Sequence, residues 1–327
     1  FEGREGYMNV GEAPGITPER NEFITNPAHK ELDMLFLFDH VSIDQSPESK
    51  WDTHAFVPKK LQDRMSRQQE AVRNAGWASL FFCNHDQPRV VSRWGNDSDR
   101  ESRELSAKAF GMLLHMHRGT PYIYEGEELG MTNAHFTELG QYRDLEAINA
   151  YRQRVEEARC QSPESMMAAL ALIGRDNART PMQWDASRYA GFTPADAATE
   201  PWIGVNPNHV EINAAEEFDD PDSVYGFYKK LIAMRHDSAT VATGEWNLLA
   251  ADDEQVYAFT RTSGDDTILV VVNLTDRSAG LPGEVAELLG DGVAESQILL
   301  STYDVAHGVK SIARGELARW EGVVIQL

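Results

Sequence analysis

Four short apolar segments punctuate the first 130 residues of the chain, and each one ends in polar side chains. They cover residues 6–13, 32–40, 77–86 and 120–130. Their apolar residues are nearly continuous rather than alternating, which is typical of strands that are buried on both faces. Polar stretches with apolar residues at helical spacing separate the last three segments, over residues 58–76 and 99–119. This alternation predicts an α/β fold with a parallel sheet.

The pattern becomes less regular after residue 130. Helical stretches are predicted near 144–158 and 162–173, and a further amphipathic helix at 219–238. Between them, residues 177–208 form a turn-rich segment that is too long for an ordinary loop. Long ordered excursions of this kind usually carry functional residues.

The last part of the chain has a strand pattern instead. Residues 254–278 and 322–327 alternate apolar runs with turn signals, which predicts antiparallel strands. We therefore expect two domains. Residues 1–239 would form the α/β part, and residues 240–327 would form a small antiparallel β-sandwich.

The composition narrows the class of partner and the compartment. The chain holds 52 acidic and 30 basic residues, a formal net charge of −22. Such a surface repels a phosphate backbone, so we expect no nucleic acid partner. No apolar segment reaches the ~20 residues that a membrane span needs, so we expect no membrane partner. The two cysteines, Cys83 and Cys160, match neither a disulfide framework nor a metal spacing and favour a reducing, cytoplasmic compartment.

The polar residues that end the four apolar segments are the candidate chemistry. In a parallel α/β protein, reactive groups gather at the carboxyl ends of the strands. Several carboxylates at one mouth suit acid/base work on a sugar, and they would equally suit a divalent metal. The residues concerned are Glu12, Asp39, His40, Asn84, His85, Asp86, Glu125, Glu127 and Glu128.

Taken alone, each of these residues also has a simpler explanation. Glu12, in "VGEAPG", could be a solvated turn residue, and Asp86 could cap a helix that follows it. Glu127 and Glu128 could lie at the start of a helix, where the helix dipole favours negative charge. The joint order and spacing of the motifs argue against these separate explanations.

Four segments together resemble a known family. They read "MNVGEAPG", "FFCNHDQPR", "RGTPYIYEGEELGM" and "RDNARTPMQWD". The combination is similar to the α-amylase superfamily, glycoside hydrolase family 13, and most of all to its oligo-1,6-glucosidase and α-glucosidase branch. The resemblance implies the C-terminal half of a (β/α)8 TIM barrel, with the four apolar segments as strands five to eight, followed by the small β domain.

The resemblance also implies catalytic roles. Glu12 would be the general acid/base at the end of the fifth strand. Asp86, after the seventh strand, would be the third carboxylate, which stabilises the transition state, and His85 beside it would donate to sugar hydroxyls. Retaining glycosidases pair such a carboxylic acid with a carboxylate nucleophile about 5–5.5 Å away.

Further residues match binding positions of the family. Arg175 would bind the non-reducing glucose, and Arg179 would brace its loop. Asp144 and Glu146 match residues that line the acceptor side of the pocket. The implied activity is that of an α-glucosidase acting on short oligosaccharides linked α-1,6 or α-1,4. No cofactor is implied, and we expect the intact enzyme to be a monomer.

One part of the family pattern does not occur in this chain. The nucleophilic aspartate of the family ends the fourth strand in a Gly-Phe-Arg-x-Asp context that is missing here, and Asp39 lies on the wrong strand to replace it. The metal-binding loop of the family, near its first strand, is missing too. We therefore expect a C-terminal fragment that is inactive alone and exposes the edges of strands five and eight. Glu125 departs from the usual glutamine of the family.

Three other functions stay open at this point. Sucrose isomerases and trehalose-forming enzymes share the scaffold, although the isomerases carry an arginine-rich segment where residues 40–52 of this chain hold no arginine. Non-catalytic homologues that escort amino-acid transporters lose the catalytic carboxylates, whereas Glu12 and Asp86 are present here. A metal-binding module could use Asp86 with Glu127 and Glu128, which a calcium titration would test.

Overall fold

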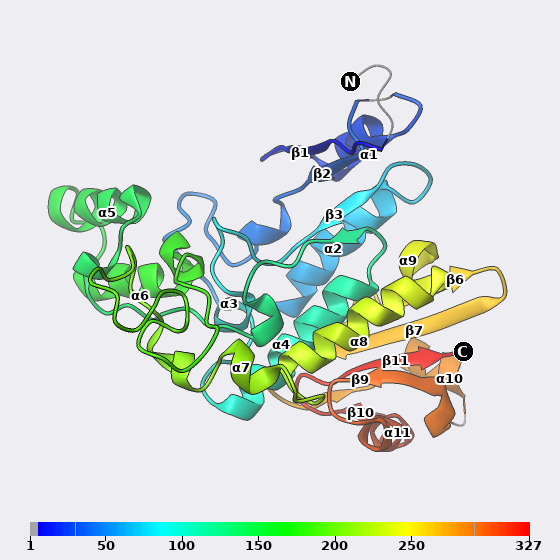
Figure 1. Ribbon diagram of the computed structural model, residues 1–327. Coiled ribbons are helices and arrows are strands. Elements are labelled where there is room, and N and C mark those ends of the chain that lie inside the picture. Colours follow the sequence, from blue (N-terminus) through cyan, green and yellow to red (C-terminus); the bar gives the residue numbers. More distant parts are fainter. Residues whose placement is uncertain (1–5, 30, 291) are drawn as a thin grey trace.

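The first part of the chain is a parallel α/β unit, as the sequence predicts. The computed structural model describes residues 6–29, 31–290 and 292–327 (Figure 1). Four short strands pair in parallel in the order β1-β2-β3-β4, and each falls inside one of the apolar segments. Their bounds are Val10–Glu12 for β1, Met34–Phe36 for β2, Ala78–Leu80 for β3 and Thr120–Pro121 for β4.

Helices connect these strands and begin where capping residues allow. Asp99 accepts a hydrogen bond from the Ser102 amide and so begins α4. Helix α2 ends earlier than predicted, and the chain then turns at Gly76, where the positive φ of 84° suits glycine and an added Cβ would lie 2.5 Å from Thr25 Oγ1. The helical segments of this region are α1 Pro18–Thr25, η1 His40–Ser42, α2 Pro58–Ala71, α3 Val90–Arg93 and α4 Arg100–Met116.

Strand β1 is less buried than its sequence pattern predicts. Val10, at the start of β1, is exposed, as are Tyr7 and Met8 just before it, whereas all three residues of β3 are buried. Within the described residues, β1 pairs with β2 only, so it forms an edge of the sheet. Burial of a strand depends on its neighbours, which an apolar run does not specify.

The irregular region forms a lobe at one side of the sheet, around α5 and α6 (Figure 1). It has a core of its own, in which Tyr142, Met166 and Leu170 are buried together with Trp51 from the loop after β2. That loop is therefore held against the lobe. The helical segments are η2 Glu127–Leu129, η3 Leu139–Gln141, α5 Leu145–Tyr151, the π-helical η4 Arg152–Glu157, α6 Pro163–Ile173, η5 Arg175–Ala178, η6 Pro207–Val210 and α7 Ala214–Glu217.

The chain ends in an antiparallel sheet, as predicted. Helix α8 leads through α9 into five strands in the order β5-β6-β7-β11-β9, while β8 and β10 form a separate two-stranded ribbon. The bounds are α8 Val224–Asp237, α9 Ala239–Thr243, β5 Glu245–Leu249, β6 Val256–Ser263, β7 Asp266–Asn273, β8 Ala279–Gly280, α10 Gly283–Leu289, η7 Glu295–Gln297, β9 Ile298–Ser301, α11 Val305–Arg314, β10 Glu316–Leu317 and β11 Gly322–Gln326.

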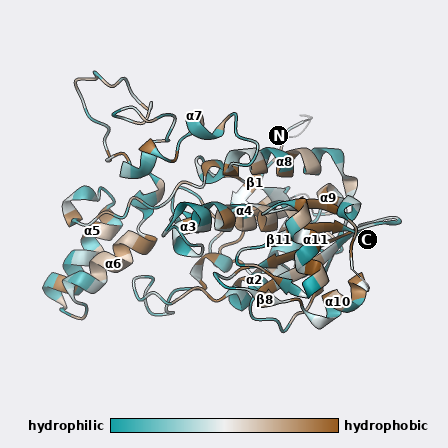
Figure 2. Cartoon of the chain, turned by 90° about the horizontal axis from the view of Figure 1, so that it is seen from below, coloured by the Kyte–Doolittle hydropathy of each residue, from teal (hydrophilic) through white to brown (hydrophobic). Residues whose placement is uncertain are grey.

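This sheet is apolar on both faces, and its strands are largely brown, the colour of hydrophobic residues, in Figure 2. On one face, Val271 and Val323 pack with Val285 of α10 and Ile312 of α11. The other face joins a core that includes side chains of α2, α4 and α8, for example Leu61, Phe110 and Tyr228. The domain division at residue 240 stays a prediction, because one continuous core spans it.

Buried polar groups add to this junction. Arg261 of β6 is buried and donates to the carbonyl of Met116 at 2.6 Å and to that of Gly244 at 2.9 Å. His117 Nε2 lies 2.8 Å from the hydroxyl of Tyr257, also on β6. Burial lowers the pKa of His117 to about 3, so this ring is neutral in the folded protein.

Candidate active site

A cavity opens at the carboxyl ends of the four parallel strands, the end where such folds place their chemistry. Its volume is about 250 Å³. Glu12, the last residue of β1, lines it from one side, and His85, after β3, lines it from another. The remaining lining residues are largely aromatic, which suits the apolar faces of a sugar ring. They are Phe36, Phe38, Phe81, Cys83, Asn84, Tyr122, Ile123 and Tyr124.

A tight turn after β3 fixes the position of Asp86. The side-chain oxygen of Asn84 accepts a hydrogen bond from the Asp86 amide at 2.7 Å, which is the geometry of an Asx turn. The helix that follows begins only after Arg89, and its cap makes no side-chain hydrogen bond. The simpler explanation of Asp86 as a helix cap is therefore wrong, and its carboxylate is available for other partners.

Two arginines from the irregular region hold the Asp86 carboxylate. Arg179 Nη2 lies 2.7 Å from Asp86 Oδ1, and Arg179 Nε donates to the carbonyl of His85 at 2.8 Å. Arg175 Nη1 lies 3.3 Å from the same Oδ1. His85 Nε2 lies 3.4 Å from Asp86 Oδ2. Both carboxylate oxygens thus have a positively charged or ionisable neighbour.

Arg175 links Asp86 to two further carboxylates. It forms a bidentate pair with Asp144, at 2.9 Å from Nε and 2.7 Å from Nη2, and its Nε lies 3.2 Å from Glu146. Burial would raise the pKa of Asp144, but the hydrogen bonds from Arg175 and the Glu146 amide, together with the charges of Arg175 and Arg179, outweigh that effect and lower the pKa. Hydrogen bonding to Asp144 raises the pKa of Arg175. Both groups are therefore charged, and the pair is fixed.

The structure brings the predicted site residues together in two ways. Six of them form one chain of ion pairs, namely His85, Asp86, Arg179, Arg175, Asp144 and Glu146. Glu12 joins them through the cavity that it shares with His85. The Asp144 side chain is only 3% exposed, which leaves it little surface for a sugar. Asp144 thus acts on Arg175, while Glu146, at 41% exposure, is open to a ligand.

Sequence reasoning missed several members of this site. Lys50, in the loop after β2, lies 2.6 Å from Glu146 across 96 residues of chain, and no local pattern indicates that contact. Tyr124 lines the cavity and donates its hydroxyl to the Ala178 carbonyl at 3.0 Å. The aromatic residues at the strand ends were a usable signal for the cavity wall.

The acidic residues after β4 do not join Asp86 in a metal site. Glu127 is buried and accepts a hydrogen bond from the Tyr228 hydroxyl at 3.2 Å. Burial raises the pKa of Glu127 to about 7. Over the described part of the chain, no group of three or more His, Cys, Asp or Glu side chains could hold a metal ion. The same residues include no helix that is long and apolar enough to cross a membrane.

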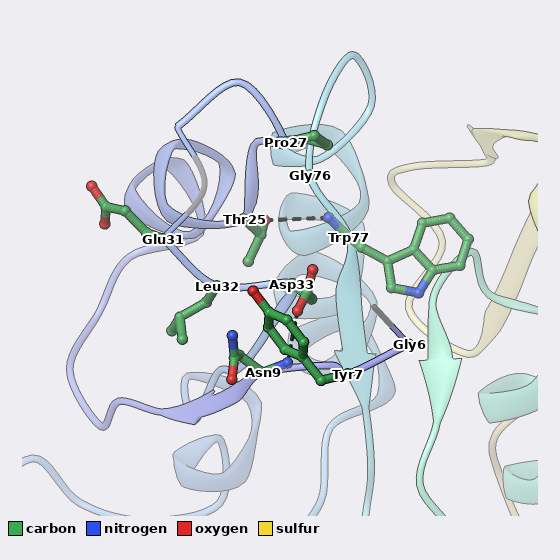
Figure 3. Close-up of a pocket in the computed structure, with 10 residues that line it drawn as sticks. All are labelled: Gly6, Tyr7, Asn9, Thr25, Pro27, Glu31, Leu32, Asp33, Gly76 and Trp77. Atoms are coloured by element: carbon green, nitrogen blue, oxygen red, sulfur yellow. Dashed lines mark hydrogen bonds between the residues drawn. The ribbon is translucent and has the colours of Figure 1, made fainter. Parts of the chain in front are cut away.

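A second hollow, of about 500 Å³, lies at the opposite end of the strands (Figure 3). Asn9, Asp33 and Trp77 line it, and they stand immediately before β1, β2 and β3, respectively. The Asn9 amide donates to Asp33 at 2.7 Å. Because this is the amino end of the strands, and none of the predicted site residues lines it, we place the chemistry in the smaller cavity.

Comparison with known families now identifies the scaffold. The family model described as "Alpha amylase, catalytic domain" matches residues 1–244. The chain belongs to the α-amylase family. A second model, "Maltogenic Amylase, C-terminal domain", matches residues 246–295, within the antiparallel sheet region. The resemblance that the motifs indicate is thereby confirmed, and the TIM-barrel scaffold of the family is the context in which the four parallel strands belong.

Several known proteins are similar to this α-amylase family chain over nearly its whole length. The oligo-1,6-glucosidase of Parageobacillus thermoglucosidasius is 42% identical over 324 residues, which cover 98% of the chain and 55% of that protein. Trehalose-6-phosphate hydrolase of Bacillus licheniformis superposes with a TM-score of 0.84 at 36% identity, over 98% of the chain and 56% of its own. Isomaltulose synthase of a Klebsiella species superposes with a TM-score of 0.85 at 32% identity, over 97% of the chain and 55% of its own. The chain spans about half the length of the relatives it matches.

Proposed function

We propose that this chain forms the C-terminal part of a retaining α-glucosidase that hydrolyses α-1,6 or α-1,4 bonds of short oligosaccharides. The observation that carries the proposal is the cavity at the strand ends, which Glu12 and His85 both line and beside which two arginines hold Asp86. Carboxyl groups that meet at the carboxyl ends of barrel strands suit this reaction.

In this proposal Glu12 is the general acid/base. It lies at the end of β1 on the cavity, with its carboxyl group exposed to an incoming ligand. It protonates the oxygen that leaves with the acceptor sugar and later takes a proton from the attacking water. The nucleophile of the family ends the fourth barrel strand, so the complete reaction needs a segment that corresponds to the other half of the relatives.

Asp86 is the group that stabilises the transition state. Positive charge grows on the anomeric carbon as the bond breaks, and a preorganised carboxylate responds to it without rearranging. Arg175 and Arg179 hold Asp86 in place through contacts of 3.3 and 2.7 Å. His85, which is largely exposed, reaches into the cavity to donate to a sugar hydroxyl.

The acceptor side is assigned to Glu146. It is the exposed end of the ion-pair chain, and Arg175 and Lys50 both contact its carboxylate. Asp144 orients Arg175 in this proposal, because Asp144 is buried in its bidentate pair with that arginine. Arg175 then presents its remaining guanidinium surface to the non-reducing glucose.

The test uses the chain joined to the N-terminal half that the relatives possess, taken from its own gene or else from the Parageobacillus relative. We call this protein the joined enzyme. Isomaltose and maltose are the substrates, and proton NMR follows the anomer of glucose that is released first. We expect the α-anomer, because retention follows from two successive displacements. Initial release of the β-anomer, or no hydrolysis of either disaccharide by a folded joined enzyme, would refute the proposal.

A sucrose isomerase is the second candidate, since the isomaltulose synthase noted above shares the scaffold. The loop after β2, where the isomerases carry arginines, has Lys50 as its one basic residue between Val41 and Asp52 in this chain. That difference favours water over fructose as the final acceptor. Sucrose offered to the joined enzyme distinguishes the two reactions, because hydrolysis yields glucose and fructose whereas isomerisation yields a new disaccharide.

The finer expectations about partner and compartment belong to the same proposal. We infer an oligosaccharide as the partner and a monomer as the state of the joined enzyme. A cytoplasmic location is supported by two free cysteines, buried Cys83 and exposed Cys160, neither of which forms a disulfide.

A further inference from the structure

Three loops that surround Asp86 are tied to one another in a closed ring of contacts. They are the turn after β3, the loop after β4 and the segment η5. Arg179, at the end of η5, donates hydrogen bonds to the carbonyl of His85 and the carboxylate of Asp86. The Tyr124 hydroxyl in the loop after β4 donates to the carbonyl of Ala178 in η5. Arg89, in the turn after β3, donates from Nη1 to the carbonyl of Glu125 at 2.5 Å and so completes the ring.

The burial of Arg89 is unusual for an arginine with so few partners. Arg89 is only 1% exposed, and its backbone amide donates to Asn133 Oδ1 at 3.0 Å. The guanidinium carbon lies 5.1 Å from the centre of the Tyr124 ring. Among the described residues, Arg89 Nε and Nη2 have no hydrogen-bond partner. A buried charge is costly, so the contacts that Arg89 does make require an explanation.

Two carboxyl groups lie close to the buried charge of Arg89. Glu127 and Glu128 follow directly after the loop that Arg89 holds. Burial raises the pKa of both carboxyl groups, and the charge of Arg89 acts in the opposite direction on each. Arg89 therefore lies close to two acidic side chains, while within the described residues its side chain makes one hydrogen bond, to the Glu125 carbonyl.

We propose that Arg89 and Tyr124 are positioning residues, which together fix His85 and Asp86 relative to the wall of the sugar cavity. This inference rests on the proposed function. Arg89 acts through the carbonyl of Glu125 and the face of the Tyr124 ring. Tyr124 acts through the carbonyl of Ala178, and thus on the arginines that hold Asp86. Neither residue needs to touch a reacting atom for the effect.

A double-mutant cycle in the joined enzyme tests this ring. The variants are Arg89→Met, Tyr124→Phe and the two combined, with kcat and KM measured for isomaltose. Each single variant opens the same ring, so each should lower kcat about tenfold with KM changed less than threefold. Because a ring that is open at one point gains little freedom from a second opening, the combined variant should lose about the same factor as the worse single variant.

Two further variants separate positioning from general stability. Arg89→Lys keeps a charged donor for the Glu125 carbonyl, so it should retain several times more kcat than Arg89→Met. Arg103→Met is the matched control, because Arg103 is also buried and donates to carbonyls after β4, at 3.0 Å to Leu129 and 3.3 Å to Gly130, outside the ring. Its loss should lower the melting temperature and leave kcat within twofold.

The possible results are distinguishable. Losses that multiply in the combined variant, a change in KM alone, or an equal kcat loss in Arg103→Met would overturn the positioning role. If Arg89→Met does not fold, Arg89→Gln, a polar side chain too short to span the contact with the Glu125 carbonyl, replaces it in the cycle and is judged by the same criterion. A wild-type joined enzyme that folds but hydrolyses no α-glucoside contradicts the proposed function instead, and an active wild type with unaffected variants contradicts only the ring.

Discussion

Replacing Asp86 by asparagine in the joined enzyme isolates the charge of one group from its shape. The carboxylate receives Arg179 at 2.7 Å, Arg175 at 3.3 Å and His85 at 3.4 Å. Asparagine keeps the side-chain size and one acceptor oxygen. It removes the negative charge that would face the developing positive charge of the sugar.

The magnitude of the effect differs between catalysis and stability. Loss of one preorganised electrostatic stabiliser costs about 3 kcal/mol in the transition state, or roughly a hundredfold in kcat. The ion pairs contribute much less to folding, because the Asp86 side chain is 36% exposed and solvent screens it. Exposed pairs of this kind contribute about 1 kcal/mol at most. We therefore expect kcat to fall about a hundredfold while the melting temperature changes by only a few degrees.

The assay compares kcat and KM for isomaltose with the melting temperature of each variant. Asp52→Asn is the matched control, because Asp52 also pairs with an arginine, Arg154, at 2.5 Å. The Asp52 side chain is 42% exposed, similar to that of Asp86. That pair lies outside the ion-pair chain of the site. We expect Asp52→Asn to change the melting temperature as much as Asp86→Asn does, with kcat within twofold of the wild type.

Two results would refute this reasoning. If Asp86→Asn raises KM and leaves kcat unchanged, the residue binds the ground state and the transition state equally. If both asparagine variants lose kcat in proportion to their loss of stability, the effect is one of folding and the charge of Asp86 has no special role.

Three other predictions concern the rest of the molecule. The 327-residue chain alone should release no p-nitrophenol from an α-glucoside and should self-associate in size-exclusion chromatography, because the edge strand β1 carries exposed Val10; a monomer with turnover would show this to be wrong. In the joined enzyme, burial lowers the pKa of His115 to about 4 and that of His117 to about 3, so the unfolded state binds more protons and stability falls as the pH drops from about 6.5 towards 4. His117→Gln should remove about 1.4 kcal/mol per pH unit from that slope in urea unfolding, and an unchanged slope counts against a neutral buried His117. Lys50→Met should raise KM for isomaltose severalfold with little change in kcat, because Lys50 pairs with Glu146; the control Lys59→Met, which breaks the surface pair with Asp63, should change neither constant.

Local signals explain why the framework of the fold could be predicted from the sequence. The apolar segments contain the four strands, and polar groups such as Glu12 and Asp86 follow where the strands end. Capping residues such as Asp99 and Ser162 determine where helices begin, and both are recognisable from sequence alone. The carboxyl ends of parallel strands share one edge, so residues that follow different strands could be assigned to one site.

Contacts between distant segments could not be predicted in the same way. Lys50 meets Glu146 where the loop after β2 lies against the lobe around α5 and α6, into whose core Trp51 packs. The burial of Asp144 depends on its bidentate pair with Arg175, 31 residues away. The exposure of Val10 on β1 depends on which strands lie beside it. Each of these properties follows from tertiary packing, which leaves no periodic trace in the local sequence.

The measurement that tests the central claim most directly is the effect of Glu12→Gln on two substrates of the joined enzyme. A glutamine cannot protonate a leaving oxygen. Hydrolysis of isomaltose, whose leaving group is a hydroxyl oxygen of the second sugar, should therefore fall by a factor of 10² or more. Compared as kcat/KM, which reports only the steps up to departure of the leaving group, hydrolysis of p-nitrophenyl α-glucoside should fall far less, because p-nitrophenolate leaves without a proton. That unequal loss is the result expected if Glu12 is the general acid at the cavity. Equal losses on both substrates, or no loss on either, would contradict the account.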